Sequence, residues 1–143
     1  MQAEKYLSAR ISDPEFWNQV NQAFGLAGGI YRVSCEGELG TRLPMPISRL
    51  LSTDPAGTLY IGMAASFVNR VIELKKSLSP DHRSAAHECG SRYKSHVAIA
   101  ERFPYQRLLI TLEHSNAPRE AELIALKTYY DTFGELPPFN RSG

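Results

Sequence analysis

The feature that most constrains the fold is a pair of short tripeptides in mirrored order. Gly29-Ile30-Tyr31 comes first, and Tyr60-Ile61-Gly62 follows further along the chain. Ile and Tyr favour the pleated, half-buried surface of a sheet, so each tripeptide predicts a strand. If the two strands pair, both tyrosine hydroxyls can project from one sheet face. Arg70 follows on a predicted helix, and two phenols beside a guanidinium could bind and attack a phosphodiester.

Length and composition predict one soluble domain with a single core. The chain has 143 residues, of which 43% are hydrophobic and 22% are charged. No run approaches the roughly 20 apolar residues that span a bilayer, and no signal peptide is evident, so we expect no membrane partner and a cytoplasmic location. Cys35 and Cys89 lack a CxxC partner, which favours free thiols over a disulfide or zinc.

The near-neutral charge limits how the chain could bind nucleic acid. The formal net charge is only +1, whereas a stand-alone nucleic-acid binder usually carries a basic surplus. Any basic surface must therefore be local. Its candidates are Lys75, Lys76, Arg83, Arg92, Lys94 and Arg107, and a scattered solvated surface is the alternative.

The first half of the chain predicts one helix and two strands. Residues 1–11 form a polar lead-in, and Asp13-Pro14 begins a helix that runs to Ala23 or Phe24. Strands are expected at Ile30–Cys35 and Thr58–Gly62. Residues 36–57 are rich in Gly and Pro and predict a long connection, with a short helical turn at Ser48–Leu51. A connection of this length is often functional, although a loop that covers the sheet fits equally well.

The second half predicts three helices and one strand. The helices are expected at Ser66–Leu78, at Arg92–Glu101 and from a cap at Ser115 or Asn116 to Gly134. The strand is Gln106–Glu113, whose continuous apolar run indicates a central position. Tyr93, Val97 and Ala100 should face inward on the second helix. The last helix should bury Leu123, Leu126, Tyr130 and Phe133, and Leu136–Asn140 should be extended because of its prolines.

These residues resemble the GIY-YIG nuclease superfamily. The likeness rests on the two tripeptides, on Arg70 ten residues after Tyr60, and on Arg119-Glu120 with Leu123 and Ile124 three and four positions after the glutamate. That segment resembles the glutamate-bearing helix of the family. Asn140, after Pro137-Pro138-Phe139, resembles the asparagine that closes the module. The resemblance spans roughly residues 28–140.

The resemblance implies an α+β fold, with a small three-stranded antiparallel sheet flanked by helices. Residues 1–27 would then be an N-terminal helical extension, and residues 28–143 the nuclease-like domain with an inserted loop at 36–57. It also implies a metal-dependent endonuclease that hydrolyses phosphodiester bonds in DNA. Related modules occur in homing and restriction endonucleases, in bacterial excision repair and in resolvases of branched DNA.

The resemblance also implies roles for individual residues. Tyr31 and Tyr60 would position the attacking water, and one phenol would accept its proton. Arg70 would clamp the scissile phosphate, because a planar guanidinium matches two phosphate oxygens. Glu120 would ligate one Mg²⁺ or Mn²⁺, and Glu122 is its competitor. The alternatives are two tyrosines packed in a core, an arginine paired with Glu73, and a glutamate that complements the helix dipole.

Other positions have supporting roles. Gly29 and Gly62 are expected to position the tyrosine strands, and Asn140 to order the backbone of the site through side-chain hydrogen bonds. Many family members carry a histidine or tyrosine one helical turn after the arginine, where this chain has Leu74. His87 or Tyr93 could supply that group from a neighbouring segment. The remaining histidines read as surface or packed residues: His82, His96 and His114.

Two kinds of function remain open from the sequence. The first is a divalent-metal-dependent DNA endonuclease, selective for branched or otherwise structured DNA or targeted by a partner protein. One site of this kind cuts one strand, so a double-strand cut would need a homodimer or two visits. The second is a DNA- or protein-binding module that keeps the fold and has lost catalysis, which Leu74 favours. A third reading, an unrelated small α+β enzyme, would require the tripeptide match to be chance, and a structure with Tyr31 and Tyr60 on opposite sheet faces would show that.

Overall fold

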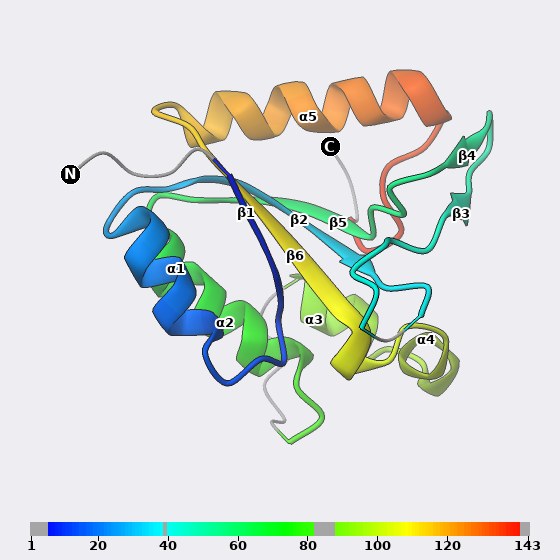
Figure 1. Ribbon diagram of the computed structural model, residues 1–143. Helices are drawn as coiled ribbons and strands as arrows, with labels where there is room; N and C mark the ends of the chain where they lie inside the picture. The colour runs from blue at the N-terminus through cyan, green and yellow to red at the C-terminus, as the bar shows by residue number, and fades with distance from the viewer. Residues whose placement is uncertain (1–5, 39, 82–87, 141–143) are drawn as a thin grey trace.

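The computed structural model describes residues 6–38, 40–81 and 88–140, and the fold is α+β. Its main sheet has four antiparallel strands in the order β1-β6-β2-β5 (Figure 1). The strands are β1 (Tyr6–Arg10), β6 (Leu108–His114), β2 (Gly29–Cys35) and β5 (Tyr60–Ala64). The predicted apolar strand, β6, lies inside the sheet between β1 and β2, as expected from its continuous apolar run.

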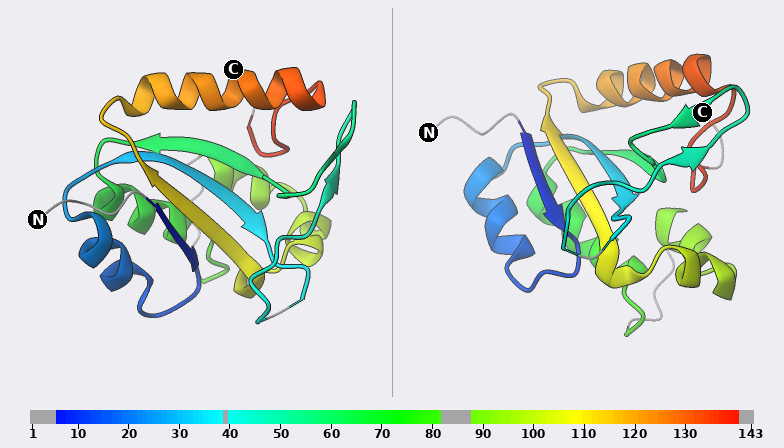
Figure 2. Two further views of the ribbon diagram at one scale, coloured as in Figure 1. Left: turned by 45° about the horizontal axis from the view of Figure 1, so that its top comes forward. Right: turned by 45° about the vertical axis from the view of Figure 1, so that its right-hand side comes forward.

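Helices cover both faces of this sheet. Figures 1 and 2 show the long helix α5 (Pro118–Phe133) along one face, with α1 (Phe16–Phe24) and α2 (Phe67–Leu78) against the other. The larger core lies on the α1–α2 side and contains Phe16, Tyr31 and Phe67, each at most 1% exposed. A smaller cluster under α5 contains Ile61, Leu126 and Tyr129. No helix in the described ranges is long and apolar enough to span a membrane.

The expectation of a three-stranded sheet was wrong because β1 adds a fourth strand. Residues 1–11 were expected to be a polar lead-in, yet Leu7 and Ala9 pair opposite Leu112 and Ile110 of β6. Leu7 and Ala9 alternate with Ser8 and Arg10, which is the period-2 pattern of a strand with one buried face. The segment before residue 28 therefore contributes a strand to the main sheet as well as the predicted helix α1.

The connection at 36–57 has structure of its own. β3 (Ile47–Ser48) and β4 (Thr53–Asp54) form a two-stranded hairpin. Residues 49–52 form its loop, so the helical turn expected at Ser48–Leu51 was wrong. The hairpin packs on the end of α5, where the Leu51 N–H donates to the Phe133 carbonyl at 3.0 Å. At the start of the connection, the fully buried Glu36 carboxylate accepts from Arg10 and from the amides of Gly40 and Arg42.

Two helical predictions also need correction. The helix expected at Arg92–Glu101 is instead α3 (Glu88–Tyr93) and α4 (Val97–Arg102), and Val97 is exposed. On α5, Leu123 and Tyr130 are more than half exposed, whereas Leu126 and Tyr129 are buried. The buried face of α5 is therefore rotated from the predicted stripe. Gly134 ends the helix in the left-handed conformation, as predicted.

Candidate active site

Tyr31 and Tyr60 lie on the same face of two paired strands. In the antiparallel register of β2 and β5, Val33 is opposite Tyr60 and Tyr31 is opposite Gly62, so both tyrosines face α2. Their ring centroids are 6.0 Å apart. A Cβ at Gly62 would lie 2.5 Å from the Tyr31 hydroxyl oxygen. Gly62 therefore leaves the space that the Tyr31 phenol occupies.

Arg70 brings a positive charge to the two phenols. It lies in the first turn of α2, directly after β5, and its guanidinium hydrogen-bonds the Tyr31 side chain. A second contact joins Arg70 Nη1 to the Glu73 carboxylate at 3.2 Å. The Arg70 side chain is 39% exposed, so part of its donor capacity faces solvent and remains available to an anion.

These side chains line one pocket of about 410 Å³ at the outer edge of β5. Its walls come from β2, β5, α2 and α5, which are far apart in the sequence. The lining side chains that can carry a charge or exchange a proton are Tyr31, Tyr60, Arg70, Glu73 and Glu122. Two phenols, a guanidinium and carboxylates thus share a concave site, which offers both hydrogen-bonding groups and a positive charge to a ligand.

The glutamate of α5 in this pocket is Glu122, whereas Glu120 is exposed and is not among the lining residues. The two residues are about 200° apart around a helix, so they point to nearly opposite sides. Glu122 shares its face with Leu126 and Tyr129, which pack on the sheet. The family-like spacing from Glu120 to Leu123 and Ile124 is misleading here, because both apolar residues are exposed. The sequence would have indicated Glu122 only if it had shown that Leu126 and Tyr129 define the buried face of this helix.

Sequence reasoning missed Glu88 as a site residue. It begins α3, and its Oε2 accepts a hydrogen bond from the Tyr60 hydroxyl at 3.4 Å. Glu88 is also close enough to Glu122 to raise its pKa by like-charge repulsion. The sequence signal was weak, because Glu88 lies within a polar stretch, residues 80–90, for which no helix or strand was predicted. His87 lies outside the described residues.

Burial dominates the electrostatics of the pocket. Burial raises the pKa of the Tyr31 and Tyr60 phenols above the ordinary value, although the positive charge of Arg70 acts in the opposite direction on both. Burial, together with repulsion from Glu88, raises the pKa of Glu122. Both phenols are therefore neutral at pH 7 and act as hydrogen-bond donors or acceptors.

Asn140 and Gly29 hold the backbone of the two tyrosine strands. The Asn140 side chain accepts from the Ile61 N–H and donates to the Ile61 carbonyl, both at 3.0 Å, which is the backbone-ordering contact expected of this residue. Gly29 lies at the start of β2, where a Cβ would meet the Glu113 carbonyl oxygen at 2.0 Å. Both residues thus act on the strands rather than on the pocket itself.

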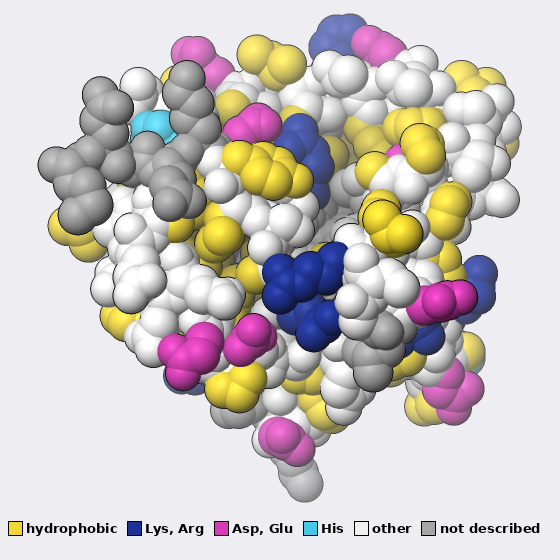
Figure 3. Space-filling view, viewed as in Figure 1, with side chains coloured by type: hydrophobic (Ala, Val, Ile, Leu, Met, Phe, Trp, Pro, Cys, Tyr) yellow, Lys and Arg dark blue, Asp and Glu magenta, His cyan; other side chains and the backbone are white. Residues whose placement is uncertain are grey.

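The described basic residues that were expected to form a rim lie outside the tyrosine pocket. Arg107 donates to the Glu36 and Gly37 carbonyls, Arg92 to the Pro138 carbonyl, and Lys75 to the Asp13 carbonyl. Arg83 lies outside the described residues. On the face shown in Figure 3, some basic side chains gather at the centre, and acidic side chains lie around them.

The oxygen donors at the site suit a hard divalent cation. Within the described residues, no group of three or more His, Cys, Asp or Glu side chains is gathered as a metal centre. Mg²⁺, however, usually takes one or two carboxylates and keeps several waters. Glu122 lines the pocket and Glu88 contacts Tyr60, so both provide carboxylate oxygens of this kind and the residues present fit such an ion.

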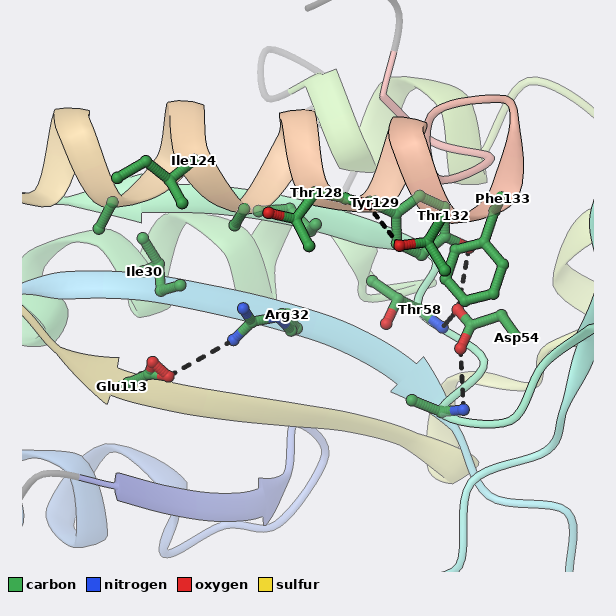
Figure 4. Close-up of a pocket in the computed structure, with 14 residues that line it drawn as sticks. Ile30, Arg32, Asp54, Thr58, Glu113, Ile124, Thr128, Tyr129, Thr132 and Phe133 are labelled. Atoms are coloured by element: carbon green, nitrogen blue, oxygen red, sulfur yellow. Dashed lines mark hydrogen bonds and ion pairs between the residues drawn. The ribbon is translucent and has the colours of Figure 1, made fainter.

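A larger hollow, of about 520 Å³, lies between α5 and the opposite face of the sheet (Figure 4). Its charged groups are paired with one another or with the backbone. Asp54 accepts from the Tyr129 hydroxyl at 2.9 Å and from two amides, and Arg32 lies 3.8 Å from Glu113. Among the described residues that line this hollow, there is no pair of phenols beside a guanidinium that is free to bind an anion. The tyrosine pocket therefore remains the candidate active site.

Searches against protein-family models, curated proteins and solved structures found no significant match to this chain. Any functional proposal therefore depends on the residues and their geometry.

Proposed function

We propose that this protein is a divalent-metal-dependent endonuclease of the GIY-YIG type that hydrolyses phosphodiester bonds in DNA. One observation carries the proposal: the phenols of Tyr31 and Tyr60, the guanidinium of Arg70 and the carboxylate of Glu122 line a single pocket. Each group has a distinct task in phosphodiester hydrolysis, and the elements that supply them are separated in the sequence. If the two tyrosines served only to fill the hydrophobic core, the fold would not need an arginine hydrogen-bonded to the buried Tyr31 phenol.

Arg70 would bind the scissile phosphate. The guanidinium offers two parallel N–H donors to two phosphate oxygens, and it stays charged at any working pH. The Tyr31 phenol holds Arg70 from the pocket floor through the side-chain hydrogen bond. Glu73, on the exposed side, would release the guanidinium when the phosphate binds, because exposed ion pairs contribute little energy.

Tyr60 would orient the attacking water and take its proton. A phenol whose pKa is raised by burial is a poor base alone. The Tyr60 hydroxyl, however, donates to the Glu88 carboxylate at 3.4 Å. As water transfers its proton to the Tyr60 oxygen, the phenol proton can pass to Glu88, and the hydroxide attacks phosphorus. The 3′ oxygen leaves and takes a proton from solvent.

Glu122 would hold one Mg²⁺ or Mn²⁺, with Glu88 close by. When bound, such an ion neutralises the charge that builds on the phosphate and on the departing oxygen. Glu122 replaces Glu120 in this proposal, because Glu120 points away from the pocket.

The test is a cleavage assay on supercoiled plasmid and on a branched DNA, with Mg²⁺, with Mn²⁺ and with chelator. We expect metal-dependent nicking that Glu122→Ala abolishes and that Glu120→Ala, the matched control on the same helix, retains. Folded wild-type protein that leaves every substrate intact in every metal would overturn the nuclease proposal.

A second candidate is a module of the same fold that binds DNA or a protein without catalysis. Leu74 favours it, because it is fully buried where many family members carry a proton-handling side chain. The Tyr60–Glu88 contact argues for the enzyme, because it provides an acceptor for the proton that Leu74 cannot take. Metal-independent DNA binding with no cleavage would favour the module.

A further inference from the structure

A groove of about 310 Å³ lies between α1 and α2, outside the tyrosine pocket. Trp17 of α1 lies on one side, and Ile72, Lys75 and Lys76 of α2 on the other. Figure 1 shows these two helices side by side beneath the sheet. The groove therefore combines one large aromatic ring with two positive charges, and among the described residues no acidic side chain lines it.

Trp17 is exposed and yet held in place. The residue is 40% exposed, while its indole Nε1 donates to the Val68 carbonyl of α2 at 3.2 Å. This hydrogen bond between the two helices satisfies the only polar atom of the indole. The remaining ring surface is apolar and open, so it can accept a flat partner without rearrangement.

The two lysines differ in whether their ammonium groups are hydrogen-bonded within the described part of the protein. Lys75 Nζ donates to the Asp13 carbonyl at 3.3 Å, which keeps the ammonium near the start of α1. Lys76 is exposed, and no partner is seen for it among residues 6–38, 40–81 and 88–140. On the exposed side of α2, the acidic side chain of Glu73 is already paired with Arg70. The groove therefore presents a local positive charge on a chain whose net charge is only +1.

The groove and the tyrosine pocket share one helix. Asn69, Arg70 and Glu73 of α2 line the pocket, and Ile72, Lys75 and Lys76 of the same helix line the groove. α2 has 12 residues and is thus about 18 Å long, so a short nucleic-acid strand can reach both. Single-stranded nucleic acid is bound in this way, by aromatic stacking of bases and by lysines that follow the phosphates. In a duplex the bases are stacked on one another and cannot cover the ring.

We propose that the α1–α2 groove binds a single-stranded stretch of the DNA substrate next to the scissile phosphate, with a base stacked on Trp17 and phosphates paired with Lys75 and Lys76. The inference rests on the proposed nuclease function, in that the strand held here is the strand cut at Arg70. It makes single-stranded flaps and junction arms, rather than uninterrupted duplex, the preferred substrates.

Trp17 is the only tryptophan of the chain, so the site carries its own reporter. In chelator, where no cleavage occurs, titration with a short oligothymidylate should quench the tryptophan emission to saturation, and added salt should reverse the quenching. An abasic oligomer of equal length has the same charge and no bases, and we expect it to bind about tenfold more weakly with little quenching. A blunt duplex of equal length should behave like the abasic oligomer.

Variants separate stacking from charge, with binding followed by the anisotropy of a fluorescein-labelled oligothymidylate. Trp17→Ala should weaken binding about tenfold, and Trp17→Phe, which keeps an aromatic ring, much less. Lys76→Ala should lower the slope of log K against log salt by about 0.7, the value for one phosphate contact on a single strand. Lys127→Ala, an exposed lysine of α5 on another surface, is the matched control and should change neither.

Equal affinity for the abasic oligomer and for oligothymidylate would overturn the stacking assignment, and so would unchanged affinity in Trp17→Ala. If Trp17→Ala does not fold, the wild-type quenching and Trp17→Phe decide the matter. The outcomes for the two proposals are distinct. Cleavage without any tryptophan response would reject the groove and keep the nuclease, whereas quenching without cleavage in any metal would keep the groove and reject the nuclease.

Discussion

The side chain of Asn140 makes two hydrogen bonds to the backbone of Ile61. Its Oδ1 accepts from the Ile61 N–H and its Nδ2 donates to the Ile61 carbonyl, both at 3.0 Å. β5 is an edge strand of the four-stranded sheet, so the amide takes the position that a further strand would have. Since Ile61 lies between Tyr60 and Gly62, a residue near the C-terminus holds the strand on which the candidate site depends.

Asn140→Ala should therefore destabilise the protein through β5. It leaves the Ile61 N–H and carbonyl without partners at a position where both residues are buried. We expect a loss of roughly 2–4 kcal/mol in the free energy of unfolding, since each unsatisfied buried polar group costs about 1–3 kcal/mol. Urea denaturation measures this loss.

Asn140→Asp separates the two hydrogen bonds, because the carboxylate keeps the acceptor for the Ile61 N–H and removes the donor to the Ile61 carbonyl. Because that charged oxygen would face the Ile61 carbonyl oxygen at a buried position, we expect its loss of stability at pH 7 to be at least as large as that of Asn140→Ala. A loss below about 0.5 kcal/mol in Asn140→Ala would contradict the role of this side chain.

Glu122→Ala should abolish cleavage without weakening the fold. Burial and repulsion from Glu88 raise the pKa of Glu122, which means that the ionised side chain is disfavoured in the folded protein. Removing it should leave the free energy of unfolding at pH 7 unchanged or slightly higher, while cleavage falls by about 100-fold or more. Urea denaturation and the plasmid assay measure the two effects. A fully active Glu122→Ala protein would reassign the metal ligand.

Arg70→Lys should retain the charge and still lose most activity. The guanidinium contacts Tyr31 and would hold two phosphate oxygens, and an ammonium cannot reproduce that planar pair of donors. We expect cleavage to fall by about 10²–10³-fold in Arg70→Ala and by a smaller factor in Arg70→Lys. Single-turnover kinetics at saturating DNA measures the catalytic step. Equal rates for wild type and Arg70→Lys would show that only the charge matters.

The buried phenols predict that stability falls at alkaline pH. The pKa values of Tyr31 and Tyr60 are raised by burial in the folded state, whereas an unfolded phenol ionises near pH ~10. Above that pH the unfolded chain loses protons that the folded chain keeps, so the free energy of unfolding decreases as pH rises. Urea midpoints between about pH 8 and pH 11 measure the slope, with the range chosen around the phenol value. A Tyr31→Phe protein should show a shallower decrease, and an identical slope would refute this origin.

The buried Glu36 carboxylate should make the stability of the connection between β2 and the hairpin sensitive to acid. Burial alone would raise its pKa, but hydrogen bonds from Arg10 and from the Arg42 and Gly40 amides more than offset this and hold the pKa below its usual value. The stabilisation is therefore present above the unfolded value near pH ~4.3 and is lost as pH falls through the folded pKa.

Glu36→Gln should lower the thermal midpoint by roughly 5–10 °C at pH 7 and remove part of the acid sensitivity. Circular dichroism melts at several pH values measure both effects. Glu38→Gln, an exposed neighbour in the same connection, is the control. A Glu36→Gln midpoint equal to wild type would mean that the connection does not depend on this carboxylate.

Several elements follow from local sequence alone. The helical spacing in α1 and α2, the apolar run of β6 and the glycine after α5 each predict what the structure contains. β1 was missed, although Leu7 and Ala9 alternate with polar residues. A five-residue strand of this kind is weakly specified on its own and is stabilised by pairing with β6.

The sequence by itself determined α1, α2, β6 and the two strands that carry the tyrosines, because side-chain alternation and apolar periodicity are properties of neighbouring residues. The register between β2 and β5, which places both tyrosines on one sheet face, belongs to the tertiary structure. Only the tertiary structure decided which carboxylates meet the tyrosines. Glu122 rather than Glu120 faces the pocket because Leu126 and Tyr129 set the rotation of α5 on the sheet. Glu88 reaches Tyr60 because α3 packs on α2 beside the site, a contact between distant segments that no local pattern records.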